Sequence, residues 1–101
     1  MTNILIFANG HADASKLSDM LGAPHVMTGE MSMAERGSII EWFHDQHTSG
    51  DALLKPAILI STRVGVSGWR APKGTTILFT ASAAQDWPKD YIIQAQGRVA
   101  I

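Results

Sequence analysis

Two short apolar runs constrain the fold of this chain more than any other feature of its sequence. Residues 3–8 (NILIFA) and 57–61 (AILIS) are nearly continuous hydrophobic stretches, and the first is followed directly by Asn-Gly. Runs of this kind are typical of strands that are buried on both faces, as in a parallel sheet. Residues 25–28 (HVMT) and 75–80 (TTILFT) predict two further short strands.

Helical patterns separate the first three of these strands. Residues 12–21 carry apolar side chains at helical spacing, and Gly22 follows as a stop signal. The apolar positions of this helix are Ala14, Leu17, Met20 and Leu21. Ser32 and Glu35 form a capping box, which predicts a second helix that fades near residues 47–50.

The last third of the chain is predicted to hold two loops and one more helix. Residues 62–74 form a Gly-rich loop, and residues 81–87 form a second loop after the fourth strand. Pro88 suits the first turn of a helix, so we expect the last helix over residues 90–100.

This order, β-α-β-α-β-loop-β-α, predicts an α/β fold of three layers with a mostly parallel sheet and right-handed crossovers. A chain of 101 residues makes one domain, residues 1–101. Ligands of such sheets meet the carboxyl ends of the strands. The unusual loops of this sequence follow those ends, which makes that edge the predicted functional edge.

Composition excludes several classes of protein. The formal net charge is −1, which argues against coating nucleic acid through bulk positive charge. No apolar stretch approaches the length of a membrane span, and the first ten residues lack the positive region of a signal peptide. The chain contains no Cys, so thiolate and disulfide chemistry are absent. We expect a soluble cytoplasmic protein without a membrane partner.

Four segments together resemble the second RecA-like lobe of superfamily 2 helicases and translocases. NILIFANGHADASKLSDML resembles the motif IV region, and MTGEMSMAERGSIIEWF resembles the segment that follows it, with Gly29, Arg36 and Phe43 in place. ILISTRVGVSGWRAP is similar to motif V, and YIIQAQGRVAI is similar to motif VI, usually Gln-x-x-Gly-Arg-x-x-Arg. The four motifs cover nearly the whole chain in the family's order, and the resemblance implies a RecA-like fold.

The resemblance also implies a set of nucleic-acid-binding residues at the functional edge. In the family this edge holds the sugar-phosphate backbone of one strand without reading bases. The matching positions are Asn9, Gly10, Gly29, Thr62 and Gly68. Backbone N–H groups of Gly-rich loops, hydroxyl donors and helix N-termini suit phosphate oxygens, which gives the assignment a physical basis. Tight turns at the glycines are the alternative.

Motif VI implies a second set, which in the family faces a nucleotide held by the first lobe. Gln94, Gly97 and Arg98 match, and Arg98 stands where the family has its first arginine. The second arginine of the motif is Ile101, and motif V has Arg70 where an acidic residue is common. Loss of an arginine finger costs roughly 10³–10⁵ in the rate of phosphoryl transfer. Arg98 therefore corresponds to a degenerate catalytic residue that needs a partner lobe.

The sequence lacks the nucleotide-binding half of the family. There is no GxxxxGK[ST] motif and no acidic Mg²⁺ box. We therefore expect no cofactor for the chain alone, with ATP and Mg²⁺ bound only if a first helicase lobe completes the site.

Several other residues have two interpretations. Trp69 and Trp87 would either stack on a base or anchor a partner, or else form a half-buried lid over the sheet. Arg36 would either contact the nucleic-acid backbone, or be a solvated helix residue or an ion pair with Glu35 or Glu41. His44 and His47 make a poor metal site without Cys, and no metal is expected. The methionines around the second strand are expected to pack in the core; they are Met20, Met27, Met31 and Met33.

These observations favour a non-catalytic second-lobe-like domain. It would bind single-stranded nucleic acid weakly, or dock a first lobe supplied in trans, or compete with an intact helicase. Trp69, Arg70 and Arg98 would form the docking face, for that lobe or for another copy of the chain. One alternative is half of a split ATP-dependent helicase, and another is an unrelated small phosphate- or nucleotide-binding α/β module.

Overall fold

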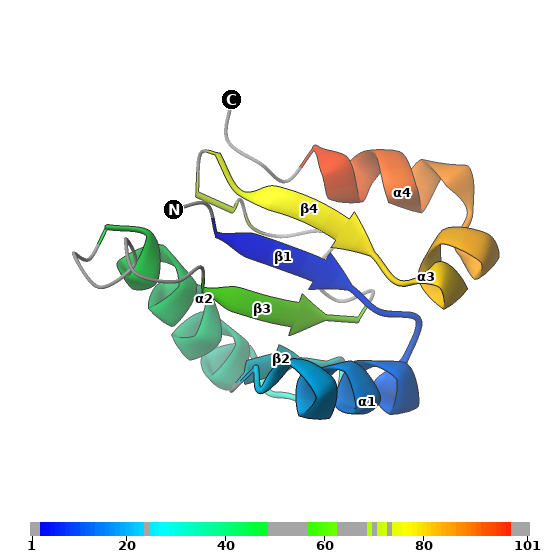
Figure 1. Cartoon of the computed structure of the whole chain (residues 1–101). Coiled ribbons are helices and arrows are strands. Elements are labelled where there is room, and N and C mark those ends of the chain that lie inside the picture. Colours follow the sequence, from blue (N-terminus) through cyan, green and yellow to red (C-terminus); the bar gives the residue numbers. More distant parts are fainter. Residues whose placement is uncertain are drawn as a thin grey trace.

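Strands and helices alternate along the chain, and one parallel sheet gathers the strands. The structure, a computed structural model, describes residues 3–23, 25–48, 57–62, 69, 71–72 and 74–97. Its elements are shown in Figure 1 and run in this order: β1 (Ile4–Phe7), α1 (His11–Leu21), β2 (His25–Met27), α2 (Met33–Thr48), β3 (Ile58–Ser61), β4 (Thr76–Phe79), α3 (Ala81–Asp86) and α4 (Lys89–Gln96).

The first strand lies inside the sheet, although it comes first in the chain. The strand order is β2-β3-β1-β4, and every neighbouring pair is parallel. Ile4 pairs with Ile58 on one side and with Thr76 on the other. The doubly buried runs of the sequence occupy the two inner positions, β1 and β3, as expected from their continuous hydrophobicity.

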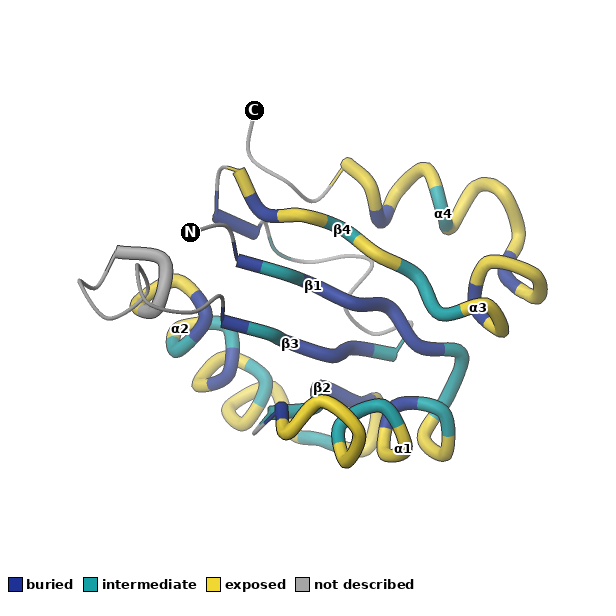
Figure 2. Tube along the Cα trace, in the orientation of Figure 1, coloured by how far each residue is buried: buried dark blue, intermediate teal, exposed yellow. Residues whose placement is uncertain are grey.

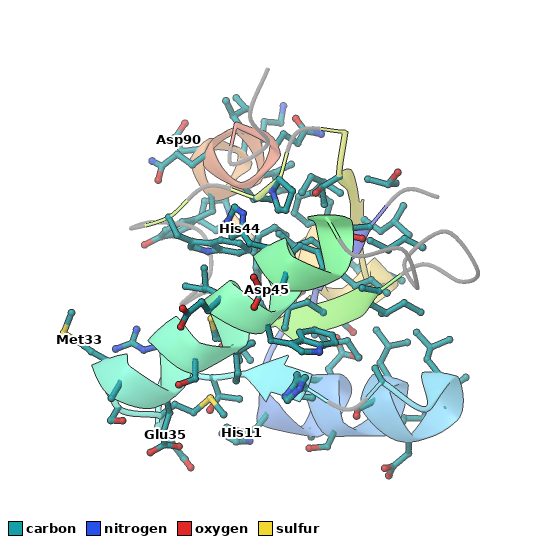
Figure 3. The ribbon with its side chains drawn as sticks, turned by 90° about the vertical axis from the view of Figure 1, so that its left-hand side faces the viewer. His11, Met33, Glu35, His44, Asp45 and Asp90 are labelled. Carbon is teal, nitrogen blue, oxygen red and sulfur yellow. The ribbon has the colours of Figure 1, made fainter. Side chains whose placement is uncertain are left out.

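Helices cover both faces of this sheet. Seen from the amino-terminal edge of the strands, α1 lies on one side, and α2 with α4 lies on the other (Figure 3). Side chains therefore alternate between two cores along each strand. The prediction of an α/β fold with a parallel sheet and helices on both faces is confirmed.

The larger core, here called the α2-side core, holds most of the aromatic side chains. Its buried members are Leu5, Phe7, Ile39, Phe43, Ala57, Leu59, Ala71, Ala83, Trp87 and Ala95. Asn3, fully buried at the start of β1, donates from Nδ2 to the carbonyl oxygen of Phe43 at 3.0 Å and so ties the sheet to α2.

The smaller core, here called the α1-side core, contains Ile6, Ala8, Ala14, Ala23 and Ile60. Small side chains dominate it because α1 lies close to β2 and β3. Figure 2 shows that burial is greatest along β1 and β3, whereas β4 and α4 are largely exposed.

Two local signals in the sequence set helix ends as expected. Gly22 ends α1 in the left-handed conformation with φ of 64°, and its N–H donates to the carbonyl oxygen of Ser18. The Ser32 hydroxyl oxygen accepts from the N–H of Glu35 at 3.1 Å and donates to the Glu35 carboxylate at 3.2 Å. The predicted cap of α2 by Ser32 is confirmed, but the Glu35 carboxylate accepts from the Ser32 hydroxyl, where a full capping box has it accept from the Ser32 backbone N–H.

The predicted loop over residues 81–87 is wrong for most of its length. Ala81–Asp86 forms α3, because Thr80 caps it by accepting from the N–H of Ala83 and because three of its six residues are alanine, a strong helix former. Trp87 follows α3, and its side chain is 4% exposed, so it lies in the α2-side core rather than on the surface.

The expectation that the four methionines pack in the core is half wrong. Met27 is buried, and Met31 packs against the α2-side core. Met20 is 71% exposed and Met33 is 83% exposed. Met20 lies in the last turn of α1, and Met33 is the first residue of α2.

Candidate functional site

The strand order makes the carboxyl end of β1 the centre of the functional edge. The chain leaves β1 toward α1 on one face of the sheet. Trp69 and Ala71, which belong to the connection after β3, pack in the α2-side core on the opposite face. In parallel sheets, a crevice opens where neighbouring strands send their connections to opposite faces. That condition holds between β1 and β3.

Two main-chain hydrogen bonds bring the predicted phosphate-binding residues together. The N–H of Ala8 donates to the carbonyl oxygen of Ser61 at 2.8 Å, and the N–H of Thr62 donates to the carbonyl oxygen of Met27 at 3.0 Å. The segments that follow β1, β3 and β2 therefore lie side by side. Asn9, Gly10, Thr62 and Gly29 belong to those segments, and Gly68 lies outside the described residues.

The start of α1 offers main-chain donors at this edge. Gly10 is the N-cap residue, and no side chain caps the helix there. Among the described residues, a Cβ added at Gly10 or at Gly29 would meet no atom within 4 Å beyond the adjoining chain. An anion can therefore approach the backbone closely at both positions, and the uncapped helix N-terminus favours negative charge.

The other half of the edge, between β1 and β4, contains a polar network that the sequence interpretation missed. Oδ2 of Asp13 accepts from the hydroxyl of Thr80 at 2.6 Å and from the N–H of Asn9 at 3.0 Å. The Asn9 side chain donates from Nδ2 to Oδ2 of Asp86 at 2.8 Å. The network joins the start of α1 to both ends of α3.

This network changes the role of Asn9. Its backbone N–H and its side-chain amide are both directed at carboxylates, which a phosphate would have to displace or approach. The hydroxyl of Thr80, followed by the N–H of Asn9, holds the pKa of Asp13 below its usual range, so Asp13 is ionised at neutral pH. Phosphate binding is therefore disfavoured between β1 and β4, and the β1–β3–β2 half of the edge is the better place for it.

The sequence contained a signal for this network. Asp13 is an acid in the first turn of a helix that follows a strand, and Thr80 ends the neighbouring strand. Residues at the carboxyl ends of adjacent parallel strands meet at one edge, so the pair was accessible to sequence reasoning. Asp86 was not, because the segment that carries it was expected to be a loop.

One further contact crosses the edge. Nε2 of His11, at the start of α1, lies 3.5 Å from Oε2 of Glu30, which follows β2. Both side chains are largely exposed. This contact places another carboxylate beside Gly29, within reach of any ligand bound there.

Of the residues that match motif VI, Gln94 and Gly97 lie on or next to α4, away from the predicted phosphate-binding residues. α4 begins beside α3 at the carboxyl end of β4 and runs back along the sheet toward its amino edge (Figure 1). Gln94 is exposed on α4, and Gly97 is the C-cap residue, whose N–H donates to the carbonyl oxygens of Ile93 and Gln94. Arg98 lies outside the described residues.

Gly97 lies against the last turn of its own helix. A Cβ at this position would lie 3.4 Å from the carbonyl oxygen of Gln94 and 3.6 Å from that of Ile93, which are ordinary van der Waals distances. Its φ of −76° suits any residue. The described surroundings of Gly97 therefore admit a small side chain, and they do not by themselves require glycine.

The expected docking face is only partly described. Trp69 is half-buried, and its ring lies 6.3 Å from the ring of Phe43 at an interplanar angle of 73°. The half-buried interpretation of Trp69 therefore fits its position, and part of the ring contributes to the α2-side core. Arg70 lies outside the described residues, as does Arg98.

Arg36 lies on α2 in a partly buried position. Its N–H donates to the carbonyl oxygen of Ser32, and its Nε atom is shielded from solvent. Among the described side chains, no three His, Cys, Asp or Glu residues come together in a way that could hold a metal ion. In the same part of the chain, no helix is long and apolar enough to cross a membrane.

Comparison with known proteins adds no relative: no protein-family model, no curated protein and no solved structure matches this chain.

Proposed function

We propose that this chain is a non-catalytic domain, similar to the second lobe of superfamily 2 helicases, that binds the backbone of single-stranded nucleic acid weakly at the carboxyl edge of its sheet. The observation that supports the proposal is the gathering of Gly10, Gly29 and Thr62 beside the uncapped start of α1. Main-chain N–H groups and a hydroxyl bind phosphate without reading bases.

The acids at the same edge limit the strength of this interaction. Asp13 and Asp86 lie on the β4 side of β1, and Glu30 lies beside Gly29. A bound strand would therefore make few phosphate contacts, on the β1–β3–β2 half alone. We expect a dissociation constant within the non-specific range of about 10⁻⁴–10⁻⁶ M, weakening as salt is raised.

The test is an NMR titration with a short oligothymidine, comparing the wild type with Gly10→Asp. Open space around Gly10 admits the new side chain, and its charge opposes phosphate. We expect at least a tenfold loss of affinity. Met20→Asp is the matched control, because it adds the same charge at an exposed position in the last turn of α1. An equal loss of affinity in both variants would refute the proposed site. So would the absence of chemical-shift changes near Gly10 and Thr62 in the wild type.

Further measurements on the same proteins distinguish the proposed function from the two alternatives. A small phosphate-binding module would respond to inorganic phosphate as strongly as to the oligonucleotide. Half of a split helicase would hydrolyse ATP with Mg²⁺ once a first lobe was added, and that activity would fall with Arg98→Ala. The proposed domain hydrolyses no ATP alone, and steady turnover by the purified chain would contradict it.

A further inference from the structure

The strand β4 forms an edge of the sheet, and no described strand pairs with its outer side. Within the described residues, its one strand neighbour is β1. The N–H groups of Thr76 and Thr80 donate to the carbonyl oxygens of Asn3 and Phe7, toward β1. Because alternate residues of a strand direct their main-chain groups to opposite sides, those of Ile77 and Phe79 point outward.

The sequence of this strand has none of the residues that usually discourage pairing with another strand. Residues 75–80 (TTILFT) contain no charge, no Pro and no Gly. The opposite edge differs, since β2 has three residues and its His25 ring lies against Trp42 of α2, with 4.3 Å between the ring centroids. Of the two edges, β4 is the one prepared for strand addition.

Apolar side chains are exposed beside this edge on both faces of the sheet. Leu78 pairs with Ile6, a member of the α1-side core, so it points to the α1 face; it is 46% exposed. On the other face, α4 packs through Ile92 and Ala95 and exposes Tyr91 and Ile93 by 39% and 66%. Figure 2 shows this exposure along β4 and α4.

We propose that two copies of this chain associate through β4, with antiparallel pairing about a two-fold axis. In the register centred on Leu78, Ile77 of each copy forms a hydrogen-bonded pair with Phe79 of the other copy. The two copies of Leu78 then face each other as the non-hydrogen-bonded pair, where side chains come closest. One register thus satisfies the outward main-chain groups and covers the exposed leucine.

The second copy is the favoured occupant because the edge is complementary to itself. Uncharged strands meet without like-charge repulsion, and the two-fold axis brings the exposed side of α4 toward its own copy. A pairing of two four-residue strands is small, below the roughly 1,200 Å² of stable interfaces, so the dimer is weak. We expect a dissociation constant on the order of 100 µM.

Sedimentation over a range of concentrations up to about 1 mM tests the proposal, with the wild type beside Leu78→Lys. Lysine at the axis places two like charges together, and we expect the dissociation constant to rise at least tenfold. Met20→Lys is the matched control, since it replaces another exposed apolar residue by lysine, and it should change the constant less than twofold. Should Leu78→Lys unfold the domain, Thr76→Lys on the same edge replaces it.

Hydrogen exchange gives an independent readout. On dilution, the amides of Ile77 and Phe79 should lose protection, whereas that of Leu78, bonded to β1, should keep it. A wild-type chain that stays monomeric throughout would overturn the proposal and leave the edge to a strand of another protein. Association that survives Leu78→Lys, or that depends on Met20, would overturn it in favour of a different surface.

Discussion

The hydroxyl of Thr80 donates to Oδ2 of Asp13 across 67 residues of sequence, with 2.6 Å between the two oxygens. This bond joins the N-cap of α3 to the first turn of α1, at the carboxyl ends of adjacent strands. Asn9 adds its backbone N–H to the same carboxylate and its side-chain amide to Asp86. The functional edge is therefore fixed on its β4 side by hydrogen bonds to carboxylates.

Replacing Asp13 by Asn should make stability less dependent on pH. The pKa of Asp13 is lowered by folding, chiefly by Thr80, so its ionised form stabilises the native state above the ordinary pKa near 4. That contribution is lost as the pH falls through the lower native value. We expect Asp13→Asn to lower the free energy of unfolding by about 1 kcal/mol at pH 7, less than the roughly 1.5–3 kcal/mol typical of a charged hydrogen bond, because the side chain is partly exposed. The difference in the free energy of unfolding between the wild type and Asp13→Asn should vanish well below pH 4.

Urea denaturation at pH 7 and at about pH 2.5 measures this difference. Asp19→Asn is the control, because Asp19 is an exposed carboxylate on the same helix. An equal effect of the two variants at both pH values would show that the network contributes nothing beyond general charge.

Trp87 should be more costly to remove than Trp69. Its ring lies 5.7 Å from that of Phe7 and 6.0 Å from that of Phe79, both in edge-on arrangements. Truncation of a buried aromatic leaves a cavity, so Trp87→Ala should lower the free energy of unfolding by about 3–5 kcal/mol. Trp69→Ala should cost less, about 1–3 kcal/mol, because that side chain is half-buried. Equal costs in chemical denaturation would contradict the assignment of Trp87 to the core.

Replacement by alanine should change the stability of the protein in opposite directions at Gly22 and Gly37. Neither Gly22 nor Gly37 has an atom within 4 Å of an added Cβ, so packing does not separate them. Gly22 has a positive φ, and alanine there should cost about 1 kcal/mol. Gly37 lies inside α2, where alanine should add about 0.5–1 kcal/mol. Thermal unfolding of the two variants should give shifts of opposite sign, and a loss in both would show that α2 is constrained at Gly37.

The capping box offers a second matched pair on α2. Ser32→Ala removes the acceptor of the Glu35 N–H and should cost about 1 kcal/mol, within the usual 0.5–2 for such caps. Ser38→Ala changes an exposed serine inside the same helix and should be neutral or slightly stabilising. Circular dichroism during urea unfolding compares them, and a cost for Ser38→Ala equal to that for Ser32→Ala would argue against a capping effect.

The parts of the fold that local chemistry decides were predictable from the sequence. The continuous apolar runs at residues 3–8 and 57–61 identify the two inner strands, since a strand buried on both faces cannot alternate. Gly22 and Ser32 set helix ends through interactions within a few residues. Such signals do not depend on where distant segments lie.

The features that depend on contacts between distant segments were not predicted from the sequence. Met20 matches the helical spacing of α1, yet its side chain is 71% exposed. Trp87 follows a polar segment, and its burial depends on Phe7 and Phe79 from two strands. The hydrogen bond from Asn9 to Asp86 was not expected, because α3, which carries Asp86, was predicted as a loop. The phosphate contact predicted for Asn9 stays a prediction. The position of Gly29 and Thr62 at one edge, in contrast, follows from the parallel sheet alone.

The central position of β1 has a consequence for how the chain is synthesised. Ile4 is translated well before its two partners, Ile58 and Thr76. Until Ile58 is made, this apolar strand has no neighbour with which to pair. Such long-range pairing slows folding and leaves apolar segments available for association with other nascent chains. The order in which the strands are made thus differs from their order in the sheet, and β1 is the strand that waits longest for its first partner.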